Sequence, residues 1–251
     1  MEHLDRLLEL TYRAERTHFW FRGFRRFVSA WLDTAAAGRT DLRLLDCGCG
    51  TGANLELLNR YGRASGFDIT ATGPQFARTH GQTRVARGSI GDIPFTDATF
   101  DIVTAFDVLY GLPDAIEHAA PREMARVLRP GGYALFTTAA LESLRGGHGS
   151  LARELRRYDR VSLTALLEGA GFEIVRISYI FATLFPLVWG VRALQRWQGG
   201  GQAAASSTEI SVPSAPVNAA LTGLVTLESW LLRAGNLPIG STLICLARKR
   251  P

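Results

Sequence analysis

The sequence has little cysteine and almost no lysine. Of its 251 residues three are cysteine, and Lys249 is the single lysine among 28 basic residues. So few cysteines exclude a disulfide scaffold. The Cys47-Gly48-Cys49 pair lacks the nearby histidine or second cysteine pair that a zinc site needs. We therefore expect reduced thiols, no metal site and a cytoplasmic protein.

Long hydrophobic runs are also missing. The most apolar stretch, residues 177–191, contains Pro186 and is shorter than the ~20 residues that a membrane span needs. The first 16 residues are charged throughout, which argues against a secretory signal. A net charge of +5 without a basic tail offers no phosphate track, so we expect no nucleic-acid partner.

Strand-like and helix-like segments alternate along the middle of the chain. Because the strand-like segments are apolar on both faces, the pattern predicts an α/β fold: a doubly wound, mostly parallel seven-stranded sheet covered on both sides. The expected strands are 42–47, 64–69, 83–88, 100–106, 133–138, 173–180 and 241–247, and the expected helices between them are 53–61, 73–80, 113–128 and 161–170.

Two regions fall outside this expected core of residues 37–180 and 239–251. Residues 1–36 are expected to form an N-terminal helical lid of one or two helices. Residues 181–238 are expected to form a helical insertion, or cap, with helices at about 182–197 and 214–234 and a flexible loop at 199–212. The role of the apolar helix at 181–197 is open: it could pack against the second helix, which we favour, or line an acceptor pocket or touch a membrane surface.

A glycine-rich loop follows the first expected strand. Residues 44–52 read LLDCGCGTG, so a strand runs into a loop that ends at a helix N-terminus. Glycine lets a ligand lie against the backbone, and the helix end offers free N–H groups. A dinucleotide site predicts G-x-G-x-x-G, whereas the spacing here is G-x-G-x-G with Asp46 two residues earlier. A carboxylate there suits a ligand with an ammonium or sulfonium group better than a pyrophosphate.

Asp68 ends the second expected strand, in the segment GFDI. A carboxylate at this place lies beside the glycine loop and can accept both hydrogen bonds of a ribose diol. The alternative is that Asp68 caps the next helix, although Thr70 could serve that purpose equally.

With these motifs in order, the sequence resembles the class I S-adenosylmethionine-dependent methyltransferases, in particular their type 11 small-molecule group. The resemblance covers about residues 42–140, through LLDCGCGTG, GFDI, GSIGDIPF, FDIVTAFDVLY and REMARVLRPGGYALFTT. It implies S-adenosyl-L-methionine as the cofactor and a small-molecule methyl acceptor as the partner.

The resemblance also implies roles for individual residues in binding this cofactor. Asp46, Gly48 and Gly50 would line its methionine portion. Asp68 would hold the ribose hydroxyls. The remaining cofactor-binding candidates would surround the adenine or offer a backbone carbonyl, and they are Ile69, Ser89, Ile90 and Phe106. Many relatives carry aspartate at the position of Ser89.

No catalytic residue is assigned. Relatives often carry a histidine after the fourth strand, where this sequence has Gly111, so a general base from that position is not available. Methyl transfer can proceed largely by proximity and orientation, and a base is needed only if the acceptor must lose a proton. Side chains that could reach the mouth of the site are His18, Tyr110, His148 and Tyr158.

An aromatic and arginine segment, FWFRGFRRF at residues 19–27, stands in the expected lid. Its arginines Arg22, Arg25 and Arg26 could pair with the methionine carboxylate or an acidic substrate, or could form a solvated helix face.

The sequence thus predicts a methyltransferase that modifies oxygen or nitrogen of a small molecule. Two alternatives remain: a catalytically inactive cofactor-binding or scaffolding relative, and, with less support, an NAD(P)-dependent oxidoreductase. Neither the acceptor nor the oligomeric state follows from the sequence.

Overall fold

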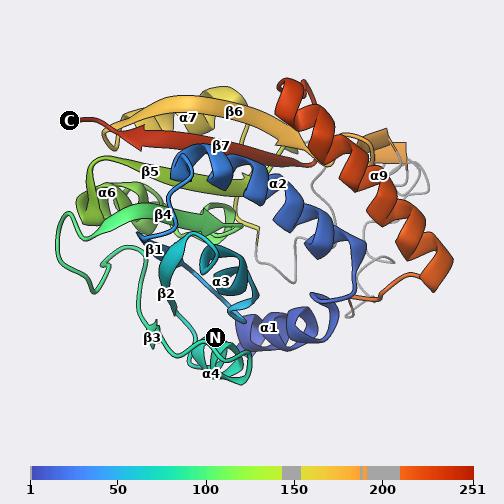
Figure 1. The fold of residues 1–251 in the computed structure, drawn as a ribbon, viewed down its shortest axis with the longest axis horizontal. Helices are drawn as coiled ribbons and strands as arrows, with labels where there is room; N and C mark the ends of the chain where they lie inside the picture. The colour runs from blue at the N-terminus through green and yellow to red at the C-terminus, as the bar shows by residue number, and fades with distance from the viewer. Residues whose placement is uncertain (1, 143–153, 187–188, 191–209) are drawn as a thin grey trace.

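The computed structural model describes residues 2–142, 154–186, 189–190 and 210–251, and its core is one seven-stranded sheet (Figure 1). The strand order is β3-β2-β1-β4-β5-β7-β6. The strands are β1 (Leu42–Cys47), β2 (Gly62–Asp68), β3 (Val85–Arg87), β4 (Phe100–Phe106), β5 (Leu128–Ala139), β6 (Phe172–Ile180) and β7 (Thr242–Lys249).

The sheet is mostly parallel, as the sequence predicts. β1 to β5 pair in parallel, and β7 runs antiparallel to both β5 and β6. The strand order reverses between β1 and β4, so the connections that follow these two strands leave toward opposite faces of the sheet. Open α/β sheets bind their ligands at the carboxyl ends of the strands at such a reversal. The predicted α/β doubly wound fold is confirmed.

The helices agree with the expected ones in place more than in length. They are α1 (Glu2–Ala14), α2 (Phe19–Ala36), α3 (Ala53–Leu58), α4 (Thr72–Thr79), α5 (Asp114–Glu117), α6 (Ala119–Val127), α7 (Arg160–Glu168) and α9 (Ala215–Ala234), with a 3₁₀ turn at Leu109–Gly111. The single helix expected over 113–128 is two helices. Pro121 has no N–H to donate to the carbonyl four residues earlier, and α5 ends at Glu117.

The Pro130-Gly131-Gly132 segment, expected as a turn before the fifth strand, lies within the bounds of β5. Its effect is visible in the pairing with β4. Phe100 pairs with Leu128 but Ile102 pairs with Tyr133, so the register shifts across this segment. Gly131 has φ of 72°, a conformation that glycine adopts without strain.

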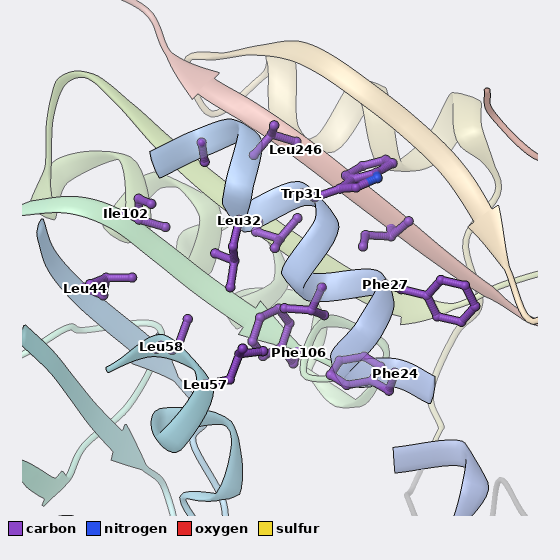
Figure 2. Packing of buried hydrophobic residues seen from close by; sticks show 14 of the residues in the cluster. Phe24, Phe27, Trp31, Leu32, Leu44, Leu57, Leu58, Ile102, Phe106 and Leu246 are labelled. Carbon is purple, nitrogen blue, oxygen red and sulfur yellow. The ribbon is translucent and has the colours of Figure 1, made fainter. Parts of the chain in front are cut away.

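Helix α2 buries one face against the sheet and the other side against α9 (Figure 1). Phe27, Trp31 and Leu32 of α2 are almost fully buried in one hydrophobic cluster with residues of the sheet (Figure 2). The approach of α2 to α9 is close, because a Cβ at Gly23 would lie 2.2 Å from Cγ1 of Val225. Helix α2 of the predicted lid is therefore packed through hydrophobic contacts against both the sheet and α9.

The segment after β6 is fixed to α9 by a buried carboxylate. Glu228 has no exposed surface. It accepts hydrogen bonds from the backbone N–H groups of Ala182 and Thr183, at 2.8 and 2.9 Å, and from the Thr183 hydroxyl at 2.6 Å. Phe181 and Leu184 are buried beside it. Packing against α9 is thus the observed state of residues 181–184, while most of the expected helix at 182–197 and most of the loop at 199–212 lie outside the described residues.

No helix in the described ranges is long and apolar enough to cross a bilayer.

Candidate functional site

The glycine loop between β1 and α3 adopts the conformation that its sequence requires. Gly48, Gly50 and Gly52 have φ values of 80°, 49° and 78°, all in the left-handed region that other residues adopt only with strain. A Cβ at Gly48 would lie 2.6 Å from Cγ2 of Val108. The loop therefore has a backbone path that depends on glycine.

Asp68 holds this loop to the end of β2. Its Oδ2 accepts a hydrogen bond from the backbone N–H of Gly50 at 3.0 Å. Its Oδ1 accepts two more, from the backbone N–H and the hydroxyl of Thr70, at 2.9 and 2.7 Å. Thr70 in turn accepts from the N–H of Gly73 at the start of α4. Thr70 rather than Asp68 thus bonds to the first turn of the helix, and the carboxylate keeps unused acceptor positions.

Asp46 lies beneath the loop. It is 1% exposed, and its Oδ1 accepts a hydrogen bond from the Thr104 hydroxyl at 2.7 Å. Burial, opposed by this hydrogen bond and reinforced by the charge of Asp68, raises the pKa of Asp46 to about 7. The structure thus places a carboxyl group that is half ionised near neutral pH under the glycine loop, next to the carboxylate of Asp68.

The other predicted cofactor residues differ in how exposed they are. Ile69 exposes 46% of its surface directly after Asp68, whereas Ile90 and Phe106 are buried at 6% and 8%. Ser89 is half-buried, and its hydroxyl accepts from the N–H of Gly91 at 3.2 Å. Ile69 is therefore the member of this set that offers an apolar side chain to a ligand.

One polar group at the carboxyl end of β4, the carboxyl group of Asp107, was not predicted from the sequence. Asp107 has φ of 56°, which is uncommon for a residue other than glycine. Its Oδ1 accepts a hydrogen bond from the Thr137 hydroxyl at 3.2 Å. Burial raises the pKa of Asp107 to about 6, and the nearby charge of Glu154 adds to this effect. The unusual backbone conformation is a signal that no sequence pattern carries.

Helix α1 and Glu15, which follows it directly, contact the glycine loop. These contacts were also not predicted from the sequence. The Thr51 hydroxyl donates to Oε2 of Glu15 at 2.5 Å, and Glu15 is 2% exposed. His80 completes the group, because its Nε2 lies 3.8 Å from Oε1 of Glu15 and its Nδ1 lies 3.1 Å from the carbonyl of Thr51. Burial raises the pKa of Glu15. Cδ2 of Leu8 would lie 3.1 Å from a Cβ at Gly50, so α1 covers the middle of the loop.

Two of the four side chains considered as general bases, His18 and Tyr158, form hydrogen bonds with other groups. Nδ1 of His18 accepts from the N–H of Trp20 and so caps α2. The Tyr158 hydroxyl donates to Oε1 of Glu117 at 2.6 Å. Burial raises the pKa of both Tyr110 and Tyr158, which makes either phenol a poor base at neutral pH. His148 lies outside the described residues.

Aromatic side chains of the lid reach the end of β4. Phe24 of α2 contacts Phe106 edge to face, with ring centroids 5.4 Å apart, and Trp20 stacks on both Phe24 and Phe181. Figure 2 shows Phe24 and Phe106 meeting at this end of the sheet. The aromatic residues of the FWFRGFRRF segment thus pack against one another and against Phe106 and Phe181, whereas Arg22 and Arg26 are exposed.

The arrangement fits the chemistry of S-adenosylmethionine better than that of a metal or a dinucleotide. Two neighbouring carboxyl groups match a cationic ligand that also carries hydroxyls, and the left-handed glycines keep side chains out of its path. A pyrophosphate would meet both carboxyl groups unfavourably. In the described ranges no group of three histidine, cysteine, aspartate or glutamate side chains could hold a metal ion, and all three cysteines are buried free thiols.

Comparisons with known proteins agree with this reading. The family described as "Methyltransferase domain" matches residues 12–177. A probable S-adenosylmethionine-dependent methyltransferase of Mycolicibacterium smegmatis is 31% identical over 161 residues, which cover 62% of this chain and 60% of that protein. A fatty-acid O-methyltransferase of the same organism is 35% identical over 109 residues, covering 39% of this chain and 37% of that protein.

Similarity to a solved structure extends over most of the chain. The phosphoethanolamine N-methyltransferase 2 of Haemonchus contortus, in complex with S-adenosyl-L-methionine, has a TM-score of 0.56 at 18% identity, covering 88% of this chain and 51% of that one. At this identity the likeness supports the fold alone. The matched part of the chain spans between about a third and two thirds of the length of the two curated relatives.

Proposed function

Since the chain belongs to the class I S-adenosylmethionine-dependent methyltransferases, we propose that it transfers a methyl group to an oxygen or nitrogen atom of a small molecule. The observation that carries the proposal is the joint placement of Asp46 and Asp68 at the adjacent carboxyl ends of β1 and β2, with the Gly50 N–H bonded to Asp68. The cofactor of the family is S-adenosylmethionine rather than a nicotinamide dinucleotide.

Each cofactor-binding residue has a proposed part that follows from its exposure. Asp68 holds ribose hydroxyls with the acceptor positions that Gly50 and Thr70 leave free. Ile69 covers an adenine face, and Ser89 and Ile90 border the adenine edge. Gly48 and Gly50 give the backbone surface for the methionine portion, while Asp46 supplies negative charge from beneath the loop. Phe106 contributes its backbone carbonyl.

Bound S-adenosylmethionine supplies an electrophilic methyl group, so the protein has mainly to orient the acceptor and exclude water. Asp107 is the group best suited to take a proton from the acceptor. It follows β4 directly, and a pKa of about 6 leaves it mostly ionised at neutral pH while it is still basic enough to accept a proton.

A small-molecule acceptor is supported by the relatives that the chain matches. The matched fatty-acid O-methyltransferase bears a name that specifies a small acceptor, and we extend only that class to this chain. A cofactor-binding relative without catalysis is the second candidate, supported by Gly111 at the place where related enzymes often carry histidine.

Calorimetry with S-adenosylhomocysteine tests the cofactor part of the proposal, and a screen of hydroxyl- and amine-bearing metabolites with methyl-labelled cofactor tests the activity. Tight binding and a labelled product are expected. Binding without any labelled product across the screen would favour the inactive relative, and no binding would overturn the proposal.

A further inference from the structure

A cavity of about 530 Å³ opens beside α3, and neither Asp46 nor Asp68 lines it. Its walls come from the connection between α1 and α2, from the first half of α2, and from α3 and the residues that follow it. Its charged lining consists of five arginines and a single carboxylate: Arg16, Arg22, Arg25, Arg26, Arg60 and Glu56.

The positions of these arginines are set by α2 and by one hydrogen bond to the backbone. Arg22, Arg25 and Arg26 stand three and four residues apart, so they share one side of α2. Nη2 of Arg25 donates to the backbone carbonyl of Glu15 at 2.7 Å. Burial lowers the pKa of Arg25, and repulsion from Arg16 and Arg22 adds to this against the opposite influence of Glu15 and Glu56. The positive charges are therefore close enough to repel one another.

The protein supplies little counter-charge. For Arg16, Arg22, Arg26 and Arg60, no ion pair within 4.0 Å is formed with any described carboxylate. Arginines elsewhere behave differently: Arg126 and Arg157 each pair at 2.7 Å with a glutamate three residues away in the sequence. An anion in the cavity would relieve the repulsion and accept hydrogen bonds from Arg16, Arg22, Arg26 and Arg60, which form no ion pair within the described part of the chain.

We propose that this cavity binds a phosphate-rich anion, namely the diphosphate or phosphate-monoester group of a small molecule. Guanidinium groups match phosphate oxygens with paired hydrogen bonds. A single carboxylate would engage one arginine, whereas a diphosphate offers enough oxygens for several. The cavity, bounded by α2 and α3, is also a local site and differs from the extended track that a nucleic-acid strand requires.

Titration calorimetry of the full chain with inorganic pyrophosphate in metal-free buffer tests the proposal. We expect one site per chain, with binding at least 10-fold weaker in the double variant Arg22→Gln/Arg26→Gln. The matched control is Arg122→Gln/Arg250→Gln, which removes the same charge from exposed residues outside the cavity and is expected to bind within twofold of the wild type. Glu56→Gln removes the one carboxylate and is expected to tighten binding several-fold, a gain that a damaged fold would not produce.

Two further arms identify the source of the phosphate and separate this site from the cofactor site. Sedimentation with phosphatidic-acid vesicles that is lost in Arg22→Gln/Arg26→Gln would assign the phosphate to a lipid headgroup, and binding of pyrophosphate without sedimentation would assign it to a soluble compound. Saturating S-adenosylhomocysteine is expected to leave the pyrophosphate affinity unchanged. Competition between the two, no binding of pyrophosphate, or an equal loss in the control would overturn the proposal. None of these readouts depends on methyl transfer, so they fail independently of the proposed function.

Discussion

Oδ2 of Asp68 accepts a hydrogen bond from the backbone N–H of Gly50 at 3.0 Å, which ties the end of β2 to the middle of the loop after β1. These residues are 18 positions apart in the chain. The bond holds the loop to this strand, and the carboxylate keeps acceptor positions that the protein does not fill with the bonds to Gly50 and Thr70. The first prediction concerns the loss of this link.

Asp68→Ala is expected to weaken S-adenosylhomocysteine binding at least 10-fold, because it removes a charged acceptor whose hydrogen bonds contribute about 1.5–3 kcal/mol each. Asp68→Asn keeps one carbonyl oxygen and should lose less. Calorimetry measures both, with circular dichroism to confirm folding. Asp41→Ala, which removes an exposed carboxylate, is the control. Unchanged affinity in Asp68→Ala would contradict the assigned role.

The stability of the protein should depend on pH through Asp46. Burial raises its pKa from the ordinary aspartate value of 3.8 to about 7, so the folded state binds this proton more tightly than the unfolded state. The stabilisation is then fully present below about pH 4 and is lost as the pH rises through 7. Between pH 5 and 7.5 the free energy of unfolding should fall by on the order of 2 kcal/mol more in the wild type than in Asp46→Asn. Urea denaturation at both pH values measures the free energy of unfolding. An equal fall of this free energy in the wild type and in Asp46→Asn would refute the prediction.

Proton release should distinguish the charged cofactor from its neutral product. A sulfonium near Asp46 favours the ionised carboxylate and lowers its pKa, so S-adenosylmethionine should release a fraction of a proton at pH 7 that S-adenosylhomocysteine does not. Calorimetry in two buffers of different ionisation enthalpy gives the number of protons. Asp46→Asn should abolish the difference between the ligands, and a difference that persists in this variant would show that another group titrates.

The glycine loop should tolerate alanine poorly at Gly48. Gly48→Ala places a residue in a left-handed conformation, which costs roughly 1–2 kcal/mol, and puts its Cβ 2.6 Å from Val108. Gly81→Ala is the matched control, because Gly81 has nearly the same φ of 78° and open space around its Cβ position. The free energy of unfolding should drop by about 1–3 kcal/mol more at Gly48 than at Gly81.

Val108→Ala combined with Gly48→Ala should restore part of that loss, since it removes the colliding methyl group. A double-mutant cycle measures the coupling. Equal losses at Gly48 and Gly81, or additive effects of Gly48→Ala and Val108→Ala, would show that the steric contact is unimportant.

The sequence was a good guide to features that depend on neighbouring residues. Apolar strands buried on both faces and glycines at the end of β1 are local patterns, and both occur where the sequence predicts them. Local patterns predicted the structure less well where a single residue interrupts a helix or a strand. Pro121 divides an expected helix, and Pro130 with its glycines produces a shift of register within β5.

Contacts between distant residues could not be predicted from one sequence. Glu15 meets Thr51 across 36 positions, and nothing in the residues around either one indicates the partner. The same holds for the arginines that line the cavity, since Arg60 joins those of α2 only through the packing of α3. Asp107 lies within the FDIVTAFDVLY motif, but the motif gave it no role, because its distinguishing features are backbone conformation and burial.

The order in which the strands leave the ribosome differs from the order in which they pair. β6 forms its ladder with β7 alone, and β7 follows about sixty residues later in the chain. Until β7 has been synthesised, one edge of β5 and all of β6 therefore lack their strand partner. Unpaired strand edges are prone to associate with other chains. Nascent chains halted before Thr242 should accordingly depend on chaperones, whereas chains extended beyond Lys249 can close the sheet by themselves.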